Sequence, residues 1–346
     1  MYDKIRASQI CGADYSDFKW LVTQLSENAH PKYIVKVSTF KKLSFKIYKD
    51  LDAVDASDRN LRKGHSYILL TMEYSLKSKV LTLAIDNSWR KWYHGANSLA
   101  DLSYRDYVHC QELLAAKLNL SIDFLRDFKI FDLEIGATCL FDKRFKLFTL
   151  CIIDHKYLKG FMRTNKQSVT VIGDNYSLKC YDKEDEIKKI KYRNLPDHSV
   201  DDCYIRSEIK ITKPSGVAIA NENFRTLKQL DVNFEKAFTF LYNQLQYLKF
   251  TDCISPQIVE NLYVARDKNA NNKNKNKEFH DLIKFQGVDA LGMDTIRELA
   301  NEFTDKPSSA INKYGEIETK FRELQNPSYR RLFFNKLKEK KLELIM

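Results

Sequence analysis

Alternating apolar and polar positions predict a series of strands before residue 215. The runs 33–40 and 43–49 are rich in Val, Ile, Phe and Tyr and flank a Lys-Lys turn, which indicates a hairpin. The runs 67–74 and 80–85 flank a polar turn and predict a second hairpin. Further strands are expected at 130–140, 147–153, 169–172, 177–182 and 204–212, with a polar turn between the first two of these.

Apolar residues recur at helical spacing elsewhere in the chain. A short helix is expected at 17–27, and Ser103 precedes a capped amphipathic helix that ends near Asn119. From about Asn221 apolar residues line one face of a long helix, namely Leu227, Leu230, Phe234, Phe238, Leu241, Leu245 and Leu248. The tract 267–277 holds Lys, Asn and Asp without an apolar anchor, so it is expected to be a flexible loop.

Together these patterns predict an α+β protein with two domains. An antiparallel sheet with helices on one face is expected over residues 1–215, followed by an all-helical region over 216–346. A chain that ends near Ser215 is expected, if it folds, to keep the chemistry of the sheet and to lose contacts made by the helices.

The chain carries a net positive charge. The 346 residues include 57 Lys and Arg against 46 Asp and Glu, a formal charge of +11, which favours a polyanionic partner because bound phosphates release counterions. A generic basic protein has the same balance. The seven cysteines form no CxxC pair, so neither a zinc site nor a disulfide framework is indicated. No signal peptide or membrane-spanning run is recognised, so a cytoplasmic location is expected.

The segment from Phe131 to Cys139 carries the first candidate chemistry. Because side chains alternate across a strand, its odd-numbered residues form an apolar face, and Asp132 and Glu134 share the opposite, polar face. Adjacent carboxylates repel one another, and a divalent cation with oxygen ligands commonly relieves that repulsion. A solvated strand face is the alternative. The run 205–211 repeats the pattern, with three isoleucines inward and Arg206, Glu208 and Lys210 outward.

A tyrosine stands between two lysines in the run 177–183. Lys179, Tyr181 and Lys183 are expected on one face of that strand. Flanking cations would stabilise a phenolate and hold a phosphate, which suits a nucleophilic tyrosine, whose hydroxyl otherwise titrates near 10. An ordinary strand tyrosine is the alternative reading among the 19 tyrosines of the chain.

Four segments in this order resemble a known family. They are the acidic strand, Thr170-Val171-Ile172-Gly173, Leu178-Lys179-Cys180-Tyr181-Asp182-Lys183-Glu184, and Ile205-Arg206-Ser207-Glu208-Ile209-Lys210. The order is similar to that of the rolling-circle replication initiators of filamentous phages and small plasmids, which are related to HUH-type nickases. The resemblance covers roughly 125–215 well and implies an HUH-endonuclease-like sheet.

The resemblance implies a role for each matched residue. Tyr181 would attack a DNA phosphate, giving a 5′-phosphotyrosine and a free 3′-hydroxyl, while Lys183 clamps the phosphate. Glu134 and Glu208 would hold Mg²⁺ or Mn²⁺, with Asp132 able to replace Glu134. The chain departs from the wider superfamily because it has no pair of histidines two residues apart.

Other departures and assignments follow from the same comparison. His155 is the best single histidine candidate for the metal, although a strand-end residue is the alternative. Lys129-Ile130-Phe131 stands where the family has an arginine. Tyr192 is too far from Tyr181 along the sequence to act as a paired nucleophile, so one-tyrosine chemistry is expected.

DNA contacts are assigned to cations on the strands and in the C-terminal tail. The assigned residues are Lys179, Arg206, Lys210, Arg330, Arg331 and Lys336. In the tail, Tyr329, Phe333 and Phe334 interleave with the cations, a pattern that suits stacked bases, and a solvated helix face is the alternative. Trp89 and Trp92 indicate either a base-stacking loop or residues that close the core.

These assignments predict a metal-dependent tyrosine nickase that acts on single-stranded or supercoiled origin DNA. A host helicase and polymerase are candidate partners, and no membrane contact is expected. A non-catalytic initiator that binds origin repeats is the alternative, in which Tyr181 and the acidic residues would have no chemical role. A mobilisation relaxase would use the same chemistry as the first hypothesis.

Overall fold

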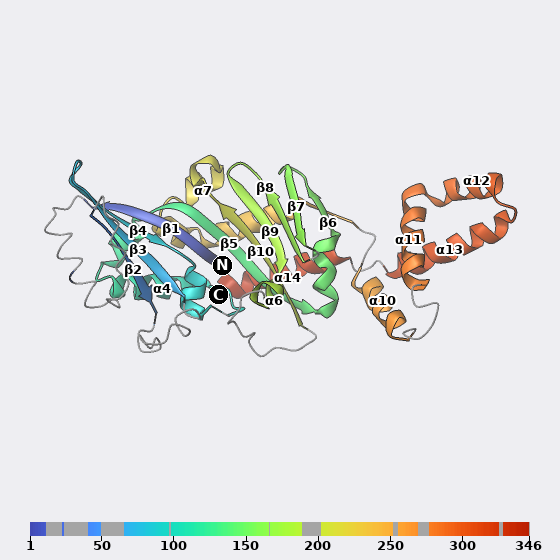
Figure 1. Ribbon diagram of the computed structural model, residues 1–346, viewed down its shortest axis with the longest axis horizontal. Helices are drawn as coiled ribbons and strands as arrows, with labels where there is room; N and C mark the ends of the chain where they lie inside the picture. Colours follow the sequence, from blue (N-terminus) through green and yellow to red (C-terminus); the bar gives the residue numbers. More distant parts are fainter. Residues whose placement is uncertain are drawn as a thin grey trace.

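The computed structural model describes residues 1–11, 23, 41–49, 66–96, 98–165, 167–188, 202–251, 255–268, 277–324 and 328–345. Within these ranges a large sheet faces the viewer in Figure 1, helices lie behind it, and a helical arm extends from one end. The expected helix at 17–27, apart from Thr23, and the expected strand at 33–40 lie outside the described residues.

In the described part of the chain, nine strands form the main sheet in the order β2-β3-β4-β1-β5-β10-β9-β8-β7. All neighbouring strands pair antiparallel. The strands are β1 (Tyr2–Cys11), β2 (Lys41–Tyr48), β3 (Tyr67–Ser75), β4 (Val80–Asp86), β5 (Lys129–Asp142), β7 (Gly160–Asn165), β8 (Ser168–Ile172), β9 (Tyr176–Asp182) and β10 (Asp202–Ile211). A second, two-stranded sheet pairs β6 (Ile152–His155) with β11 (Leu248–Phe250).

The alternation of apolar residues predicted most of these strands. The hairpin of β3 and β4 is confirmed, as are β8, β9 and β10 near their expected bounds. The first strand, β1, was not expected, although it lies in the middle of the sheet between β4 and β5. Its apolar residues Tyr2, Ile5 and Ala7 are buried, but a register shift between Tyr2 and Ile5 breaks the period of two.

A second register shift changes which residues of β5 face the core. Arg6 pairs with Asp132, whereas the next residue, Ala7, pairs with Ile130, so Phe131 is bulged out of the ladder. Ile130 is buried and Phe131 is 52% exposed. The expectation that Phe131 belongs to the apolar face was therefore wrong, while Leu133 and the following odd-numbered residues do face the core.

The strand expected at 147–153 is mostly a 3₁₀ helix, η2 (Lys143–Cys151), and only its end forms β6. The buried residues Phe145, Phe148 and Cys151 recur every three positions, which is the repeat of a 3₁₀ helix. Phe145 stacks on Phe141 of β5 with ring centroids 3.9 Å apart. This packing stabilises the helix in a segment whose composition indicated a strand.

The helices of the main body are α3 (Trp89–His94), α4 (Tyr104–Lys117), α5 (Ile122–Arg126), α6 (Lys183–Lys188), η3 (Pro214–Gly216), α7 (Ala218–Asn223), α8 (Leu227–Val232), α9 (Phe234–Gln246) and α14 (Tyr329–Ile345). The expected capped helix is confirmed as α4, in which Ser103 and Asp106 form a capping box. The expected long helix is divided into α7, α8 and α9, and its last expected residue, Leu248, begins strand β11. The apolar residues of the expected face are nevertheless buried.

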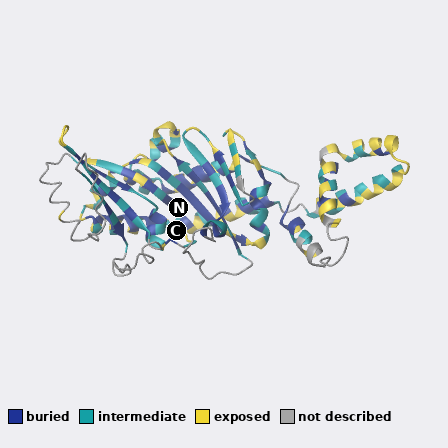
Figure 2. Cartoon of the chain, in the orientation of Figure 1, coloured by how far each residue is buried: buried dark blue, intermediate teal, exposed yellow. Residues whose placement is uncertain are grey.

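One hydrophobic core joins the sheet to these helices. It includes Leu133 of β5, Phe238 of α9 and Phe333 of α14, so it continues past residue 215 to the last helix. Figure 2 shows the buried positions as stripes along the strands. A chain that ends near Ser215 would lose α7, α8, α9 and α14 from this core, so it is not expected to fold. Trp89 and Trp92 are also buried in it and close the core.

The arm consists of α10 (Pro256–Lys268), α11 (Lys277–Leu291), α12 (Met293–Phe303) and α13 (Pro307–Leu324). It has its own small apolar cluster, formed by Ile258, Leu282, Phe285, Ile317 and Phe321. Residues 267, 268 and 277 of the expected flexible tract are helical, and 269–276 lie outside the described residues. None of the helices that the structure describes is both long and apolar enough to span a membrane.

The two clusters predict different consequences for two phenylalanine substitutions. Phe333→Ala should lower the stability of the main body by about 3–5 kcal/mol, because it removes a buried ring that contacts Phe148. Phe321→Ala in the arm should leave that transition nearly unchanged. Trp89 and Trp92 lie in the main core, so urea unfolding followed by tryptophan fluorescence measures it. Equal losses in both variants would show that arm and body unfold together.

Candidate active site

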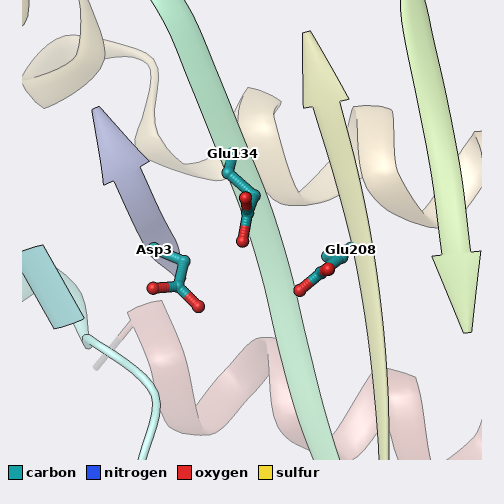
Figure 3. Close-up of side chains that lie close together, drawn as sticks. All are labelled: Asp3, Glu134 and Glu208. Carbon is teal, nitrogen blue, oxygen red and sulfur yellow. The ribbon is translucent and has the colours of Figure 1, made fainter. Parts of the chain in front are cut away.

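Three carboxylates converge on the face of the sheet opposite α9 and α14. Asp3, Glu134 and Glu208 come from the adjacent strands β1, β5 and β10, and one ligand atom of each lies within 4.8 Å of the others. Figure 3 shows the three side chains directed toward one another in front of the strands, with helices behind. An all-oxygen donor set of this kind suits a hard divalent cation such as Mg²⁺ or Mn²⁺.

Two buried arginines compensate part of this negative charge. Asp3 Oδ2 accepts hydrogen bonds from Arg90 Nε at 3.2 Å and from Arg206 Nη2 at 2.8 Å, and Ser88 donates to Asp3 Oδ1. Burial alone would raise the pKa of Asp3, but Arg90 and Arg206 hold that pKa well below its usual range. Asp3 is therefore ionised and paired.

Glu134 is in the opposite situation. Burial, and then the neighbouring Glu208 carboxylate, raise the pKa of Glu134 from 4.5 to about 8. Within the described part of the chain no side chain or backbone group forms a hydrogen bond with its carboxyl group. Glu134 thus has oxygen atoms available to a ligand and, with no cation nearby, is protonated at neutral pH.

Tyr181 of β9 reaches this cluster through Glu208. Its hydroxyl donates to Glu208 Oε2 at 3.1 Å, and Lys183 Nζ lies 3.5 Å from the same hydroxyl. Lys179 Nζ lies 4.1 Å from the centre of the tyrosine ring. The sequence pattern therefore placed Lys179 and Tyr181 on one strand face correctly, whereas Lys183 is the first residue of α6 and reaches the hydroxyl from the helix.

The surroundings of Tyr181 shift its pKa in the direction opposite to the expected one, which was toward a phenolate. Burial, and then the Glu208 carboxylate, raise the pKa of Tyr181 well above 10, and Arg206 offsets only part of this. Only 4% of the residue is exposed. The flanking lysines therefore do not produce a phenolate here, and Tyr181 is a neutral phenol whose proton is directed at Glu208.

Lys183 is buried beside the tyrosine. Burial, followed by the nearby cations Arg206 and Arg90, lowers the pKa of Lys183 to about 8, although its ion pair with Glu186 opposes that shift. Its Nζ atom is the lysine nitrogen that lies within 3.5 Å of the Tyr181 hydroxyl.

Two residues assigned to the metal from sequence lie outside the cluster. Asp132 shares a strand face with Glu134, but it lies opposite Arg6 and is not among the converging carboxylates. His155 lies on β6 in the smaller sheet. Its Nδ1 accepts from the backbone N–H of Leu158 at 3.0 Å and its Nε2 lies 3.2 Å from the Gln244 carbonyl oxygen. With both ring nitrogens engaged, His155 does not contribute to the cluster.

The cations assigned to DNA fall into three groups. Arg206 is fully buried and pairs with carboxylates, so a direct DNA contact by its side chain was a wrong expectation. Lys179 and Lys210 are half-buried on the strands of the site, Lys210 opposite Glu134. Arg330, Arg331 and Lys336 are exposed on α14, which packs on the other face of the sheet.

The aromatic residues of the tail have a different role from the one expected. Tyr329 and Phe333 are buried against η2 and β5, so they stabilise the core and do not present rings to bases. Phe334 is partly buried and contacts Tyr242 and Arg330. The exposed face of α14 is basic without an aromatic platform.

Sequence analysis missed several residues of the site. Asp3 was missed because β1 was missed, and Arg90 and Asp101 lie outside any expected strand. Glu186 lies in α6 after Lys183 and pairs with that lysine. The spacing from Lys183 to Glu186, a helical i, i+3 pair, was the available signal, whereas nothing local marks Asp101.

Comparisons with known proteins do not identify the chain. No protein family matches the sequence, and no curated protein matches it. Among solved structures, the di-domain ARO/CYC protein BexL from the BE-7585A biosynthetic pathway is similar over 70% of this chain and 95% of its own, with 9% identity and a TM-score of 0.17. StfQ, the di-domain ARO/CYC protein of the steffimycin pathway, covers 70% and 96%, with 11% identity and a TM-score of 0.17. Scores this low do not establish a shared fold.

The raised pKa of Glu134 predicts a pH-dependent stability in the absence of divalent cations. The folded pKa of about 8 lies above the ordinary value of 4.5, so the stabilising proton is lost as pH rises through that interval. In EDTA the melting temperature should therefore fall between pH 6 and pH 8.5. Glu134→Gln should flatten this dependence, while Glu73→Gln on β3 should not. Identical pH profiles for the wild type and Glu134→Gln would refute it.

Proposed function

We propose that this chain is a rolling-circle replication initiator that nicks single-stranded origin DNA with Tyr181. The observation that supports the proposal is the meeting of a tyrosine hydroxyl, a buried lysine and three carboxylates on one face of an antiparallel sheet. Tyr181, Lys183, Glu134 and Glu208 are also the residues matched by the family resemblance. The tyrosine and the three carboxylates come from four separate strands, so a chance run in sequence does not account for their contact.

In the proposed reaction the Tyr181 oxygen attacks a backbone phosphorus atom. The phenolic proton passes to Glu208, whose Oε2 already accepts the hydrogen bond from that hydroxyl. The O–P bond to tyrosine forms as the bond to the 3′-oxygen breaks, and the departing oxygen takes a proton from solvent. The products are a 5′-phosphotyrosine and a 3′-hydroxyl that a polymerase can extend.

A divalent cation is a proposed cofactor of this step. Asp3, Glu134 and Glu208 would hold Mg²⁺ or Mn²⁺, and Asp3 takes the position that Asp132 was expected to supply. The donor atoms fit, because all are carboxylate oxygens and Glu134 has no other partner among the described residues. A bound cation would stabilise negative charge on the phosphate in the transition state.

DNA would reach the site across the strands that carry Lys179 and Lys210. Both lysines stand beside the acidic cluster, Lys179 opposite Glu208 and Lys210 opposite Glu134. Because Tyr181 is buried beneath Lys179 and Lys183, these side chains would move toward the phosphate as it binds. The net charge of +11 favours such a polyanion.

A covalent adduct is the direct test of the proposal. Incubation of the full chain with oligonucleotides tiled across its replicon and Mn²⁺ should yield a protein–DNA adduct resistant to denaturation. Tyr181→Phe removes only the hydroxyl, so it should abolish the adduct while leaving the fold and DNA binding nearly unchanged. The reaction is followed by denaturing electrophoresis of labelled DNA.

The control is Tyr157→Phe, an exposed tyrosine of the β6–β7 connection, which should still form the adduct. Tyr192 lies outside the described residues, and its phenylalanine variant should also remain active. An adduct with Tyr181→Phe would assign the attack to another tyrosine. No adduct with the wild type under any tile or metal would favour the non-catalytic origin-binding initiator.

The exposed cations of α14 predict a salt-dependent contribution to DNA affinity. Replacing Arg330 and Arg331 with Gln should reduce the slope of log affinity against log salt by about 2, if each contacts one phosphate. Arg297→Gln in the arm, a residue paired with Asp294, should leave the slope unchanged. An unaltered slope in the double variant would show that Arg330 and Arg331 contact solvent and not DNA phosphates.

A further inference from the structure

We infer that Arg206 is a positioning residue of the proposed nicking site, holding in place the Glu208 oxygen that receives the Tyr181 proton. The inference rests on the proposed function. Arg206 Nε donates to Glu208 Oε2 at 3.1 Å, and the Tyr181 hydroxyl donates to the same oxygen at 3.1 Å. Arg206 also lies opposite Tyr181 in the pairing of β9 and β10. The arginine acts on the tyrosine through the carboxylate between them.

The other end of the guanidinium group is fixed by buried partners. Arg206 Nη1 donates to Asp101 Oδ1 at 2.7 Å and to Thr138 Oγ1 at 2.9 Å, and Nη2 donates to Asp3 Oδ2 at 2.8 Å. The Arg206 side chain is completely buried, and so is that of Asp101. The guanidinium plane cannot rotate without breaking several charged hydrogen bonds, so Glu208 is held by a rigid donor.

Asp101 holds the guanidinium group of Arg206 by a carboxylate that is not one of the three proposed metal ligands. Its carboxylate also accepts from the backbone N–H of Thr138 at 2.6 Å, at a point on β5 that lies beyond the first residue of β1 and is not paired with that strand. A cation bound by Asp3 and Glu208 would compete with Arg206 for those two carboxylates. Asp101 would retain the guanidinium group and keep it directed at Glu208.

Gly136 provides the space that the guanidinium group occupies. This glycine lies opposite Glu208 on β5, and a Cβ atom there would be 2.6 Å from Arg206 Nη2 and 3.0 Å from Cζ. A glycine inside a central strand weakens the strand, and it is expected where another group must approach the backbone closely. The close approach here is that of Arg206.

The test uses Gly136→Ala in the full chain, because this change displaces the guanidinium group without altering any charge. The added Cβ atom would also lie 3.1 Å from Glu208 Cβ, so a second variant that leaves β5 unchanged is needed to test Arg206 alone. The rate of adduct formation at saturating oligonucleotide should fall by about 100-fold, the lower end of what a positioned general base contributes. The oligonucleotide concentration for half-maximal rate should stay the same. The remaining rate should rise with pH more steeply than that of the wild type, because solvent hydroxide replaces the misplaced Glu208.

Gly160→Ala is the matched control. Gly160 also lies in a strand, and an added Cβ atom would be 3.1 Å from Ile172, but it is remote from Arg206 in the strand order. This variant should keep the wild-type rate and pH profile. Asp101→Asn provides a second variant that keeps the side-chain shape while removing the anchoring charge, and it should reproduce the effect of Gly136→Ala. Thermal unfolding checks that each variant is folded.

The outcomes separate the inference from the proposed function. A folded Asp101→Asn with the wild-type rate would overturn the role of Arg206, even if Gly136→Ala is slow, because the alanine also contacts Glu208. A change confined to the half-saturating DNA concentration would also overturn it, since Arg206 would then affect binding and not proton transfer. If the wild type forms no adduct, the proposed function fails, and the inference fails with it.

Discussion

The centre of this protein depends on balancing buried charge. Arg206 is completely enclosed, and it contacts carboxylates from β1, from the segment before α4 and from its own strand. Removing one partner of such a group leaves an uncompensated charge in a medium of low polarity, at a cost of roughly 3–5 kcal/mol. The contacts of Arg206 therefore fix not only the site but also the relative position of chain segments that are remote in sequence.

The charge balance around Arg206 requires strands that are distant in sequence to lie next to one another at the site. β1, β5 and β10 are neighbours, although β1 begins the chain and β10 starts at residue 202. Each contributes one carboxylate, and β9 adds the tyrosine from the next position. Helices α9 and α14 pack on the opposite face, so the apolar residues of β5 and β10 stabilise the core while their polar neighbours face the acidic cluster. One set of strands thus serves both purposes through alternation alone.

Alternation is also what made part of the site predictable from sequence. Glu134, Glu208 and Tyr181 could be placed on polar faces because they lie in β5, β10 and β9, whereas Lys183 follows β9 as the first residue of α6. Asp3 could not, because register shifts in β1 interrupt the period of its buried residues. Asp101 lies in an irregular segment, and its importance comes from a partner that is distant in sequence. The sequence also did not reveal which polar residues are buried. The strand pattern marks Arg206 as polar, but it does not show that other segments cover this side chain completely.

The same burial determines the protonation of the whole site. Without a cation, it raises the pKa of Tyr181 and of Glu134 and lowers that of Lys183, so each group is shifted toward its neutral form. Asp3 stays ionised despite its burial because two arginines pair with it and lower its pKa. Positive charge introduced near Glu134 and Glu208 would favour ionised carboxylates and would lessen the repulsion that opposes a tyrosinate. The residues thus affect one another's protonation, and Tyr181, the proposed nucleophile, remains a neutral phenol until positive charge enters the site.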